Sequence, residues 1–129
     1  QKPAYHRVCS RVRDELAFGP VQMGLKPADI RQRVDDALEL LGLTRLASRP
    51  PYTLSGGEKK RTAIASILTM NPQVWTMDEP ESYLDADGLA WLEDFLPSLK
   101  AAGKTLIIAS HHAARLGDLI DKEIVVGDA

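Results

Sequence analysis

The chain has 129 residues, of which 44% are hydrophobic and 26% charged. This balance is typical of one globular domain and excludes an intrinsically disordered chain. The longest apolar runs, at 106–109 and 124–126, are too short to span a bilayer. A single cysteine, Cys9, excludes an internal disulfide bond and fits a reducing compartment.

The charges are nearly balanced but unevenly distributed. Sixteen basic and eighteen acidic residues give a net charge of −2, too close to neutral to predict nucleic acid as a partner. Residues 1–61 carry 12 Lys and Arg against 7 Asp and Glu, whereas residues 62–129 carry 4 against 11. The first half could face anionic phosphates, lipid headgroups or an acidic partner, and the second could hold a cation. Two solvated faces that attract each other would explain the same distribution.

The first part of the chain is predicted to be helical. We expect a short helix at 14–18, which Gly19 and Pro20 end. The apolar spacing then predicts a helix over 27–41, with a proline in its first turn and Gly42 after its end.

Helices and strands alternate in the rest of the chain. A loop at 54–57 leads into a helix at about 58–70, and short apolar runs read as buried strands. The predicted strands are 74–77, 105–109 and 123–126, and the further helices are 87–102 and 113–119. Such alternation predicts an α/β fold with a parallel sheet covered by helices.

Polar residues follow the first two predicted strands. Asp78 and Glu79 come after one strand, and Ser110 and His111 come after the other. Ligand sites of parallel sheets lie beyond the carboxyl ends of the strands. We therefore expect these two clusters to converge at one edge of the sheet.

Each cluster also has a plain structural interpretation. Asp78 could hold Mg²⁺ and Glu79 could polarise an attacking water, or the pair could be a helix cap or a surface turn. His111 could donate to a phosphate oxygen or be purely structural.

A third candidate site precedes the helix at 58–70. Ser55, Gly56 and Gly57 could bind an anion through free backbone amides at the helix start. Three cations in the first turn, at 59–61, break the local preference for acids there, which often marks function. Taken alone, this short motif is also found in ordinary turns.

Together these segments resemble an ATP-binding-cassette (ABC) ATPase. Residues 54–61 match the family signature, 74–80 resemble the Walker B strand with its glutamate, Leu84-Asp85 matches the D-loop and Ser110-His111 the switch histidine. The order and spacing of all four agree with the family. Gln1-Lys2-Pro3 resembles the start of the Q-loop, and residues 14–20 resemble ATPase subunits of cobalt, nickel and vitamin importers of the energy-coupling-factor type.

The resemblance implies a role for each matching residue. The family fold is a P-loop NTPase, so this chain would be a partial one that binds ATP and Mg²⁺. The signature residues would contact the γ-phosphate of an ATP held by the opposite subunit. The other matching residues would bind Mg²⁺, orient the attacking water, hold the γ-phosphate or couple the two ATP sites. The implied assignments are Ser55, Gly56 and Gly57 for the γ-phosphate, Asp78 and Gln1 for Mg²⁺, Glu79 for the attacking water, His111 for holding the γ-phosphate, and Asp85 for coupling the two sites.

The resemblance also implies partners and segments. Two ATPase subunits, identical or different, would sandwich ATP head to tail, and a transmembrane importer component would dock on the helical subdomain. The protein would then be cytoplasmic and peripheral on the inner face of the membrane, without nucleic acid. The implied segments are a Q-loop remnant at 1–10, the helical subdomain at 11–53, the signature at 54–61 and the C-terminal part of the ATPase core at 62–129.

One family element is missing from the 129 residues. The Walker A loop, Gly-x-x-x-x-Gly-Lys-Ser/Thr, lies upstream of the Q-loop in the family, and this chain begins at Gln1 without Met. That start suggests a processed product, a fragment or an incomplete sequence. We expect the chain alone not to hydrolyse ATP, because phosphoryl transfer depends on positioning the triphosphate. We also expect the strand at 123–126 to be displaced, unpaired or completed by another chain.

A second interpretation therefore stays open. The chain could be a non-catalytic truncated fragment that acts as an interaction module or complements a chain bearing Walker A. Three positions also depart from the family pattern: Glu81 stands where Thr is usual, Tyr83 where Gly is frequent, and His112 where Asp is common. Glu81 adds charge for which the sequence suggests no partner.

Overall fold

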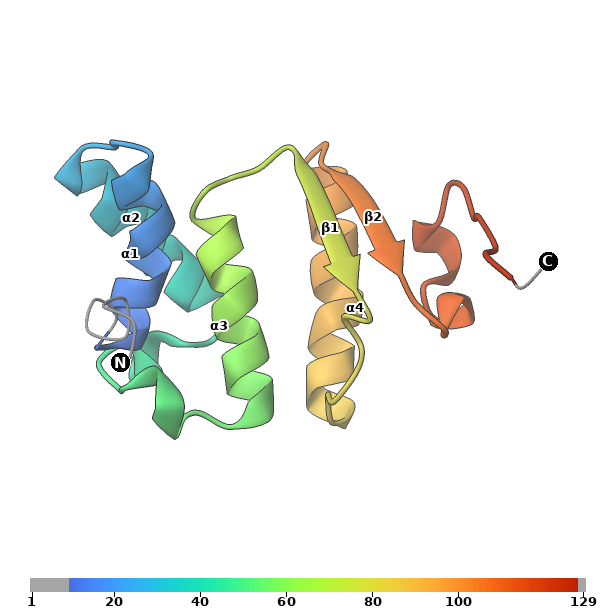
Figure 1. Cartoon of the computed structure of the whole chain (residues 1–129), viewed down its shortest axis with the longest axis horizontal. Coiled ribbons are helices and arrows are strands. Elements are labelled where there is room, and N and C mark those ends of the chain that lie inside the picture. Colours follow the sequence, from blue (N-terminus) through green and yellow to red (C-terminus); the bar gives the residue numbers. More distant parts are fainter. Residues whose placement is uncertain (1–9, 128–129) are drawn as a thin grey trace. The chain divides into compact units, whose positions relative to one another are not determined.

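The computed structural model describes residues 10–127. The chain divides into two compact units, Gln1–Pro72 and Gln73–Ala129. Figure 1 labels the helices and strands of both. The boundary falls inside the segment 62–129 that was expected to belong to the ATPase core.

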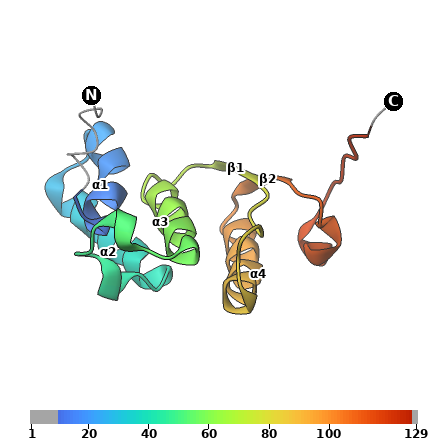
Figure 2. The same ribbon diagram turned by 60° about the horizontal axis from the view of Figure 1, so that its bottom comes forward.

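The first unit is built from helices. Its main helices are α1 (Val12–Gln22), α2 (Pro27–Leu40) and α3 (Gly56–Leu68), joined by 3₁₀ turns at Thr44–Leu46 and Pro51–Thr53. Helix α1 packs against both α2 and α3, as Figures 1 and 2 show. Leucine and valine side chains from these helices and the intervening turns form the buried core: Val12, Leu16, Val34, Leu38, Leu41, Leu43 and Leu46.

Helix α1 is longer than the sequence predicted, and the expected break at Gly19 and Pro20 is wrong. Pro20 is buried inside the helix. A proline has no N–H, so the carbonyl oxygen four residues earlier, that of Leu16, loses its helical donor. The Thr69 hydroxyl lies 2.9 Å from this oxygen and can donate to it, and the same hydroxyl also lies 2.8 Å from the Ser66 oxygen. A distant side chain can therefore satisfy the group that the proline leaves unpaired.

Gly19 packs closely against the Met70 side chain. A Cβ atom at this position would lie 2.6 Å from Cγ of Met70, much closer than real side chains approach. The glycine in α1 therefore serves the close contact with Met70 and does not end the helix.

The second unit is a small α/β unit. Strands β1 (Val74–Asp78) and β2 (Thr105–Ala109) pair in parallel, and helix α4 (Ala86–Ala101) connects them. The register aligns Val74 with Thr105 and Asp78 with Ala109. This confirms the predicted parallel pairing. Two parallel strands need a long crossover connection, and α4 provides it.

Helix α4 covers one face of this sheet (Figure 2). Trp75 of β1 is 2% exposed and meets Phe95 of α4 edge to face, with ring centroids 6.1 Å apart. Trp91 stacks on the same Phe95 at 4.8 Å. The residues that alternate onto the opposite face are open, with Val74 51% and Ile107 58% exposed.

The last part of the chain differs from its prediction. Two 3₁₀ turns, Ala113–Arg115 and Gly117–Leu119, replace the expected helix at 113–119. Residues 123–126 do not form a strand, and Ile124, Val125 and Val126 are 75%, 83% and 92% exposed. Within the described residues this segment has no place in the sheet; the segment was expected to be a strand that is displaced, unpaired or completed by another chain, and of these it is unpaired.

Across residues 10–127, none of the helices combines the length and the apolar character needed to cross a membrane.

Candidate functional site

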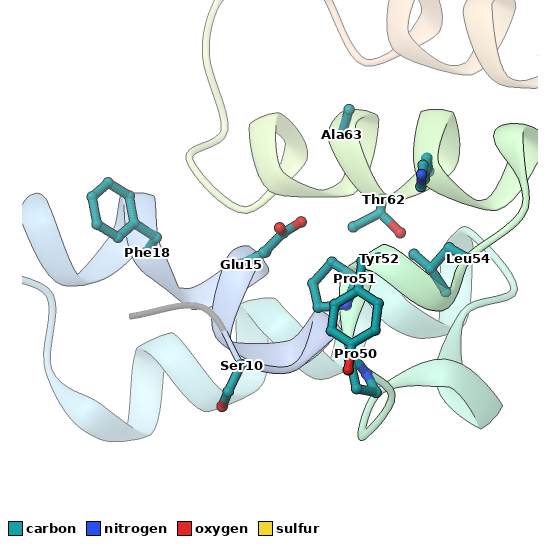
Figure 3. Close-up of a pocket in the computed structure, with 10 residues that line it drawn as sticks. Ser10, Glu15, Phe18, Pro50, Pro51, Tyr52, Leu54, Thr62 and Ala63 are labelled. Atoms are coloured by element: carbon teal, nitrogen blue, oxygen red, sulfur yellow. The ribbon is translucent and has the colours of Figure 1, made fainter. Parts of the chain in front are cut away.

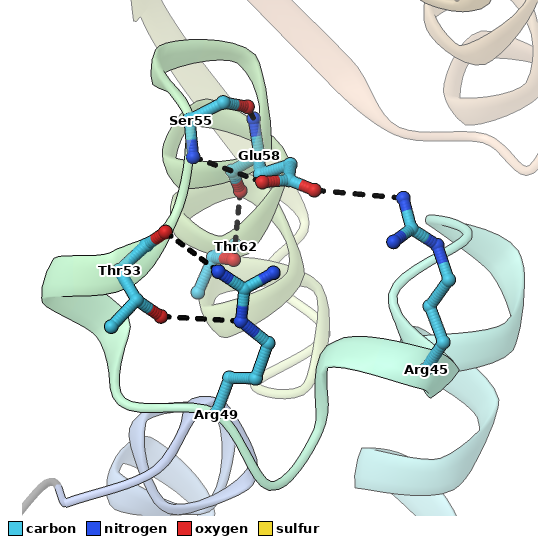
Figure 4. Close-up of polar contacts among 6 residues, drawn as sticks. All are labelled: Arg45, Arg49, Thr53, Ser55, Glu58 and Thr62. Carbon is cyan, nitrogen blue, oxygen red and sulfur yellow. Dashed lines mark hydrogen bonds and ion pairs between the residues drawn. The ribbon is translucent and has the colours of Figure 1, made fainter.

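The helix start that follows the loop at 54–57 is fixed by a reciprocal pair of hydrogen bonds (Figure 4). Ser55 is the N-cap of α3, and its Oγ accepts from the backbone N of Glu58 at 3.2 Å. In return, Glu58 Oε1 accepts from the backbone N of Ser55 at 2.9 Å. The Ser55 hydroxyl oxygen is thus an acceptor within the helix, and its own proton is left to donate outward.

Arginines outside α3 brace this helix start (Figure 4). Arg45 Nη2 lies 3.6 Å from Glu58 Oε2. Arg49 donates to the Thr53 carbonyl oxygen at 2.8 Å and to its hydroxyl at 3.2 Å. The hydrogen bond from the Ser55 backbone, assisted by Arg45 and Arg49, lowers the pKa of Glu58 although partial burial opposes this.

The glycines at the helix start leave room for a ligand. A Cβ atom added to Gly56 or Gly57 would meet nothing within 4 Å. The first-turn amides of a helix have no acceptor inside the helix, and they favour negative charge. Because α3 begins at Gly56, the three cations expected in its first turn, Lys59, Lys60 and Arg61, instead run from the end of that turn into the next one. The arrangement is suited to one oxyanion, such as a phosphate oxygen.

The second candidate cluster lies at the carboxyl ends of β1 and β2. Asp78 is the last residue of β1 and pairs with Ala109. The next residue, Glu79, turns away with a positive φ of 48°, and its backbone N donates to the Ala109 oxygen at 2.7 Å. This conformation is uncommon for a residue other than glycine.

The turn brings Glu79 to His111. Glu79 Oε1 accepts from the backbone N of His111 at 3.2 Å and lies 3.4 Å from His111 Nε2. The predicted convergence of these two side chains is therefore present within the second unit. The imidazole is 90% exposed and the Glu79 side chain 28% exposed, so both can be reached from solvent.

A second link, which the sequence did not suggest, joins the same two loops. The Ser110 hydroxyl donates to Glu81 Oε1, and the Ser110 oxygen accepts from the backbone N of His112 at 2.9 Å. Glu81 therefore has the partner that sequence reasoning could not name. The strand register could have indicated it, because aligning Asp78 with Ala109 brings the residues just after both strands together.

Asp85 occupies a helix terminus. Its Oδ1 accepts from the backbone N of Gly88 at 2.8 Å, which makes Asp85 the N-cap of α4. The predicted coupling role of Asp85 is not tested by this contact. An N-cap role accounts by itself for an aspartate at this place.

Asp78 could bind Mg²⁺ only in a site where the protein supplies few of the ligands. Within the described residues, no group of three or more His, Cys, Asp or Glu side chains could hold a metal ion. Mg²⁺ keeps several waters and is commonly held by one or two carboxylates together with substrate phosphates. The exposed Asp78 carboxylate suits such a site, in which water and phosphate supply most of the oxygens.

The first unit also contains a hollow of about 1100 Å³ (Figure 3). It lies between the N-terminal half of α1 and the start of α3, and Phe18, Pro51, Tyr52 and Leu54 give it an apolar lining. Glu15 lies in its wall, and partial burial raises the pKa of this carboxyl group. Phe18 and Tyr52 are 46% and 82% exposed.

The predicted residues fall into separate places. The phosphate-binding candidates Ser55, Gly56 and Gly57 belong to the first unit, and the acidic and histidine candidates belong to the second. The Q-loop candidate Gln1 lies outside the described residues. The predicted site residues in the second unit are Asp78, Glu79, Asp85 and His111.

Comparison with known proteins identifies the class. The family model described as ABC transporter matches residues 3–82. The parallel strands with their connecting helix, the capped glycine turn and the acidic strand end thus occur in a chain that belongs to the ABC transporter family, with part of the P-loop NTPase fold of its ATPases.

Two of the similar proteins within this family are named as ATP-binding proteins of transporters. The chain is 46% identical over 123 residues to the energy-coupling factor transporter ATP-binding protein EcfA of Methanoculleus marisnigri, covering 90% of this chain and 44% of that protein. It is 50% identical over 101 residues to the nickel import ATP-binding protein LarO of Lactiplantibacillus plantarum, covering 78% and 42%.

A solved structure agrees with these relatives. CbiO1 of Clostridium perfringens, part of the ABC transporter complex CbiONQ, matches with a TM-score of 0.70 and 42% identity, over 79% of this chain and 41% of that one. The chain therefore spans less than half the length of each of these three relatives.

Proposed function

We propose that this chain is part of an ATPase subunit that couples ATP binding and hydrolysis to import through a membrane, with cobalt, nickel or a vitamin as the cargo class. The observation that carries the proposal is the meeting of Glu79 and His111 where β1 and β2 end, with Oε1 and Nε2 3.4 Å apart. The likeness to EcfA and to the nickel import protein LarO supports the importer class.

In this proposal the second unit supplies the groups around the attacking water. The Glu79 carboxylate accepts a hydrogen bond from the water and orients it, as a general base requires. His111 donates from its exposed imidazole to a γ-phosphate oxygen. Asp78 would hold Mg²⁺, which would supply positive charge against the phosphates.

The first unit supplies a phosphate contact to a second nucleotide-binding subunit. The Ser55 hydroxyl and the backbone amides of Gly56 and Gly57 would all donate to one phosphate oxygen. The open space beside the two glycines would let that phosphate come close to the backbone. The ATP would be held by the opposite subunit, either a copy of the same protein or a different ATPase. Asp85 would couple the two sites, and Gln1 would respond to Mg²⁺ and water.

The helical segment 11–53 is the proposed docking region for the transmembrane component. The hollow beside α1 supports this role, because Phe18 and Tyr52 line it and leave apolar side-chain area exposed (Figure 3). The protein would then work at the cytoplasmic face of the membrane, as a peripheral subunit.

The decisive test is ATP hydrolysis by a polypeptide that carries this chain together with a Walker A segment. We expect Mg²⁺-dependent turnover, and we expect Glu79→Gln to reduce it by about 10²–10⁴-fold while Mg²⁺–ATP binding persists. A Glu93→Gln variant, altered on the exposed face of α4, is the matched control and should retain turnover. Unchanged hydrolysis in Glu79→Gln would contradict the proposal.

A calorimetric titration of the 129-residue chain with Mg²⁺–ATP addresses the alternative of an interaction module. We expect no saturable binding, because the residues present contact only part of the triphosphate. Saturable binding would mean that the chain forms a complete nucleotide site by itself.

A further inference from the structure

We propose that Glu81 is a positioning residue: through Ser110 it holds the loop after β2 where His111 meets Glu79. This inference rests on the proposed function of Glu79 and His111. Glu81 would not touch the substrate. It would act through the backbone of residues 110–112.

Two parallel links join the loops that follow β1 and β2. In one link, Glu79 contacts the backbone N and the ring of His111. In the other, Glu81 accepts from the Ser110 hydroxyl. Because Ser110 is the residue directly before His111, any movement of Ser110 also moves the amide that donates to Glu79.

Ser110 passes this restraint on to the next residue as well. Its hydroxyl oxygen accepts from the backbone N of His112 at 2.9 Å while its proton goes to Glu81. A serine hydroxyl that donates to a fixed carboxylate and accepts from a nearby amide has a single preferred orientation. The backbone of 110–112 is therefore held on both sides of His111.

The environment of Glu81 makes this link costly to break. Its second oxygen, Oε2, is buried and finds no hydrogen-bond partner within the described part of the chain. Burial would raise the pKa of Glu81, but the Ser110 hydrogen bond, with further hydrogen bonds and the charge of His112, lowers it on balance. A carboxylate with one buried, unpaired oxygen depends on the partner of the other, because an unsatisfied buried charge is expensive.

The test is backbone amide hydrogen exchange, measured by nuclear magnetic resonance on the full 129-residue chain without nucleotide. We expect Glu81→Ala and Ser110→Ala to accelerate exchange of the His111 and His112 amides about tenfold, the size of one lost charge-assisted hydrogen bond. Exchange of the backbone amides within β2 should not change. Glu81→Gln keeps a carbonyl oxygen that accepts from Ser110, so it should stay within about threefold of the original protein.

The double variant Glu81→Ala with Ser110→Ala separates a specific link from general loosening. If the two residues act through each other, the double variant exchanges no faster at His111 than either single variant, and no faster at His112 than Ser110→Ala, which alone removes the acceptor of the His112 amide. Additive acceleration, unchanged exchange at His111 and His112, or equal acceleration throughout β2 would each overturn the proposal.

This experiment fails independently of the proposed function. If the proposed ATPase role proved wrong, the exchange results would still stand, since the measurement contains no nucleotide. In a polypeptide that does hydrolyse ATP, Glu81→Ala should lower kcat with little change in KM, and Glu81→Gln should restore it. A change confined to KM would contradict a positioning role.

Discussion

Ser55 and Glu58 satisfy each other across the first turn of α3: Glu58 N donates to Ser55 Oγ at 3.2 Å, and Ser55 N donates to Glu58 Oε1 at 2.9 Å. Neither bond of this capping box uses the Ser55 hydroxyl proton. The same serine thus stabilises a helix and, in the proposed function, contacts a phosphate. The two roles require different properties of the side chain and can be separated by substitution.

Ser55→Asp should keep the cap and lose the phosphate contact. Aspartate is as good an N-cap as serine, but its negative charge would repel a phosphate oxygen. We expect urea unfolding followed by far-ultraviolet circular dichroism to shift by less than about 0.5 kcal/mol. ATP turnover in a complemented polypeptide should fall by at least about tenfold, because a donated hydrogen bond becomes a charge repulsion.

Two further variants control this comparison. Ser55→Thr retains both the cap and the hydroxyl proton and should behave like the original protein. Ser55→Ala loses the cap and should cost about 1 kcal/mol of stability. Full turnover in Ser55→Asp would exclude a phosphate contact at this residue.

Glu58 should make stability depend on pH in one direction. Its pKa is lowered below the ordinary value of 4.5, first by the hydrogen bond from the Ser55 backbone. A carboxyl group with a lowered folded-state pKa contributes stability that is present above its unfolded pKa. That contribution is lost as the pH falls from about 4.5 through the lowered value.

The measurement is urea unfolding of the original chain and of Glu58→Gln between about pH 7 and pH 3. The original chain should be the more stable at neutral pH, and the difference should shrink as the pH falls. Glu39→Gln, at an exposed position of α2, serves as the control. A difference between the original and Glu58→Gln that grows in acid would contradict the assigned hydrogen bond.

Thr69→Val should destabilise the first unit although the side chain keeps its shape. Thr69 is 2% exposed, and its hydroxyl can donate to the Leu16 oxygen that Pro20 leaves without a helical donor. Removing that donor leaves a buried carbonyl unsatisfied, which costs about 1–3 kcal/mol. Circular dichroism during urea unfolding gives the value.

Thr69→Ser is the matched control for this position. It keeps the hydroxyl and loses only a methyl group, so it should cost less than about 1 kcal/mol. A more stable Thr69→Val than Thr69→Ser would show that packing, and not the hydrogen bond to Leu16, matters here.

Tyr83→Gly should stabilise the second unit. Tyr83 has a φ of 64° and is 99% exposed, so it pays for a left-handed backbone without packing in return. That conformation costs a non-glycine residue about 1–2 kcal/mol, and glycine adds about 0.4–1 kcal/mol of unfolded-state entropy. The expected net gain is about 0.5–1 kcal/mol.

Tryptophan fluorescence during urea unfolding reads this effect, because both tryptophans, Trp75 and Trp91, belong to the second unit. Tyr83→Ala keeps the left-handed cost and should change stability by less than about 0.5 kcal/mol. An equal gain in the alanine variant would point to the tyrosine ring and not to the backbone.

The sequence predicted the two paired strands of the second unit accurately. The apolar run at 105–109 gave the exact bounds of β2, and the run at 74–77 gave β1 to within one residue. Parallel pairing then brought Glu79 and His111 together as expected. Buried strands are bounded by abrupt changes from apolar to polar residues, so the amino acids mark their ends.

Glu81 and its partner show the opposite case. The sequence placed a charge there with no partner, because Ser110 is 29 positions away. Only the register of β1 against β2 brings the two side chains within hydrogen-bond distance.

By itself, then, the sequence determined the alternation of helices and strands, the capped glycine turn and the residues that follow each strand, because these depend on local preference and on the periodicity of apolar residues. The tertiary structure alone decided that α1 continues through Gly19 and Pro20, since Thr69 and Met70, about 50 positions away, supply the donor and the close contact. It also decided the link between Glu81 and Ser110 and the absence of a strand at 123–126. A backbone group left unpaired by local sequence is stable wherever a distant residue satisfies it, and an apolar run forms a strand only where another strand is there to pair with it.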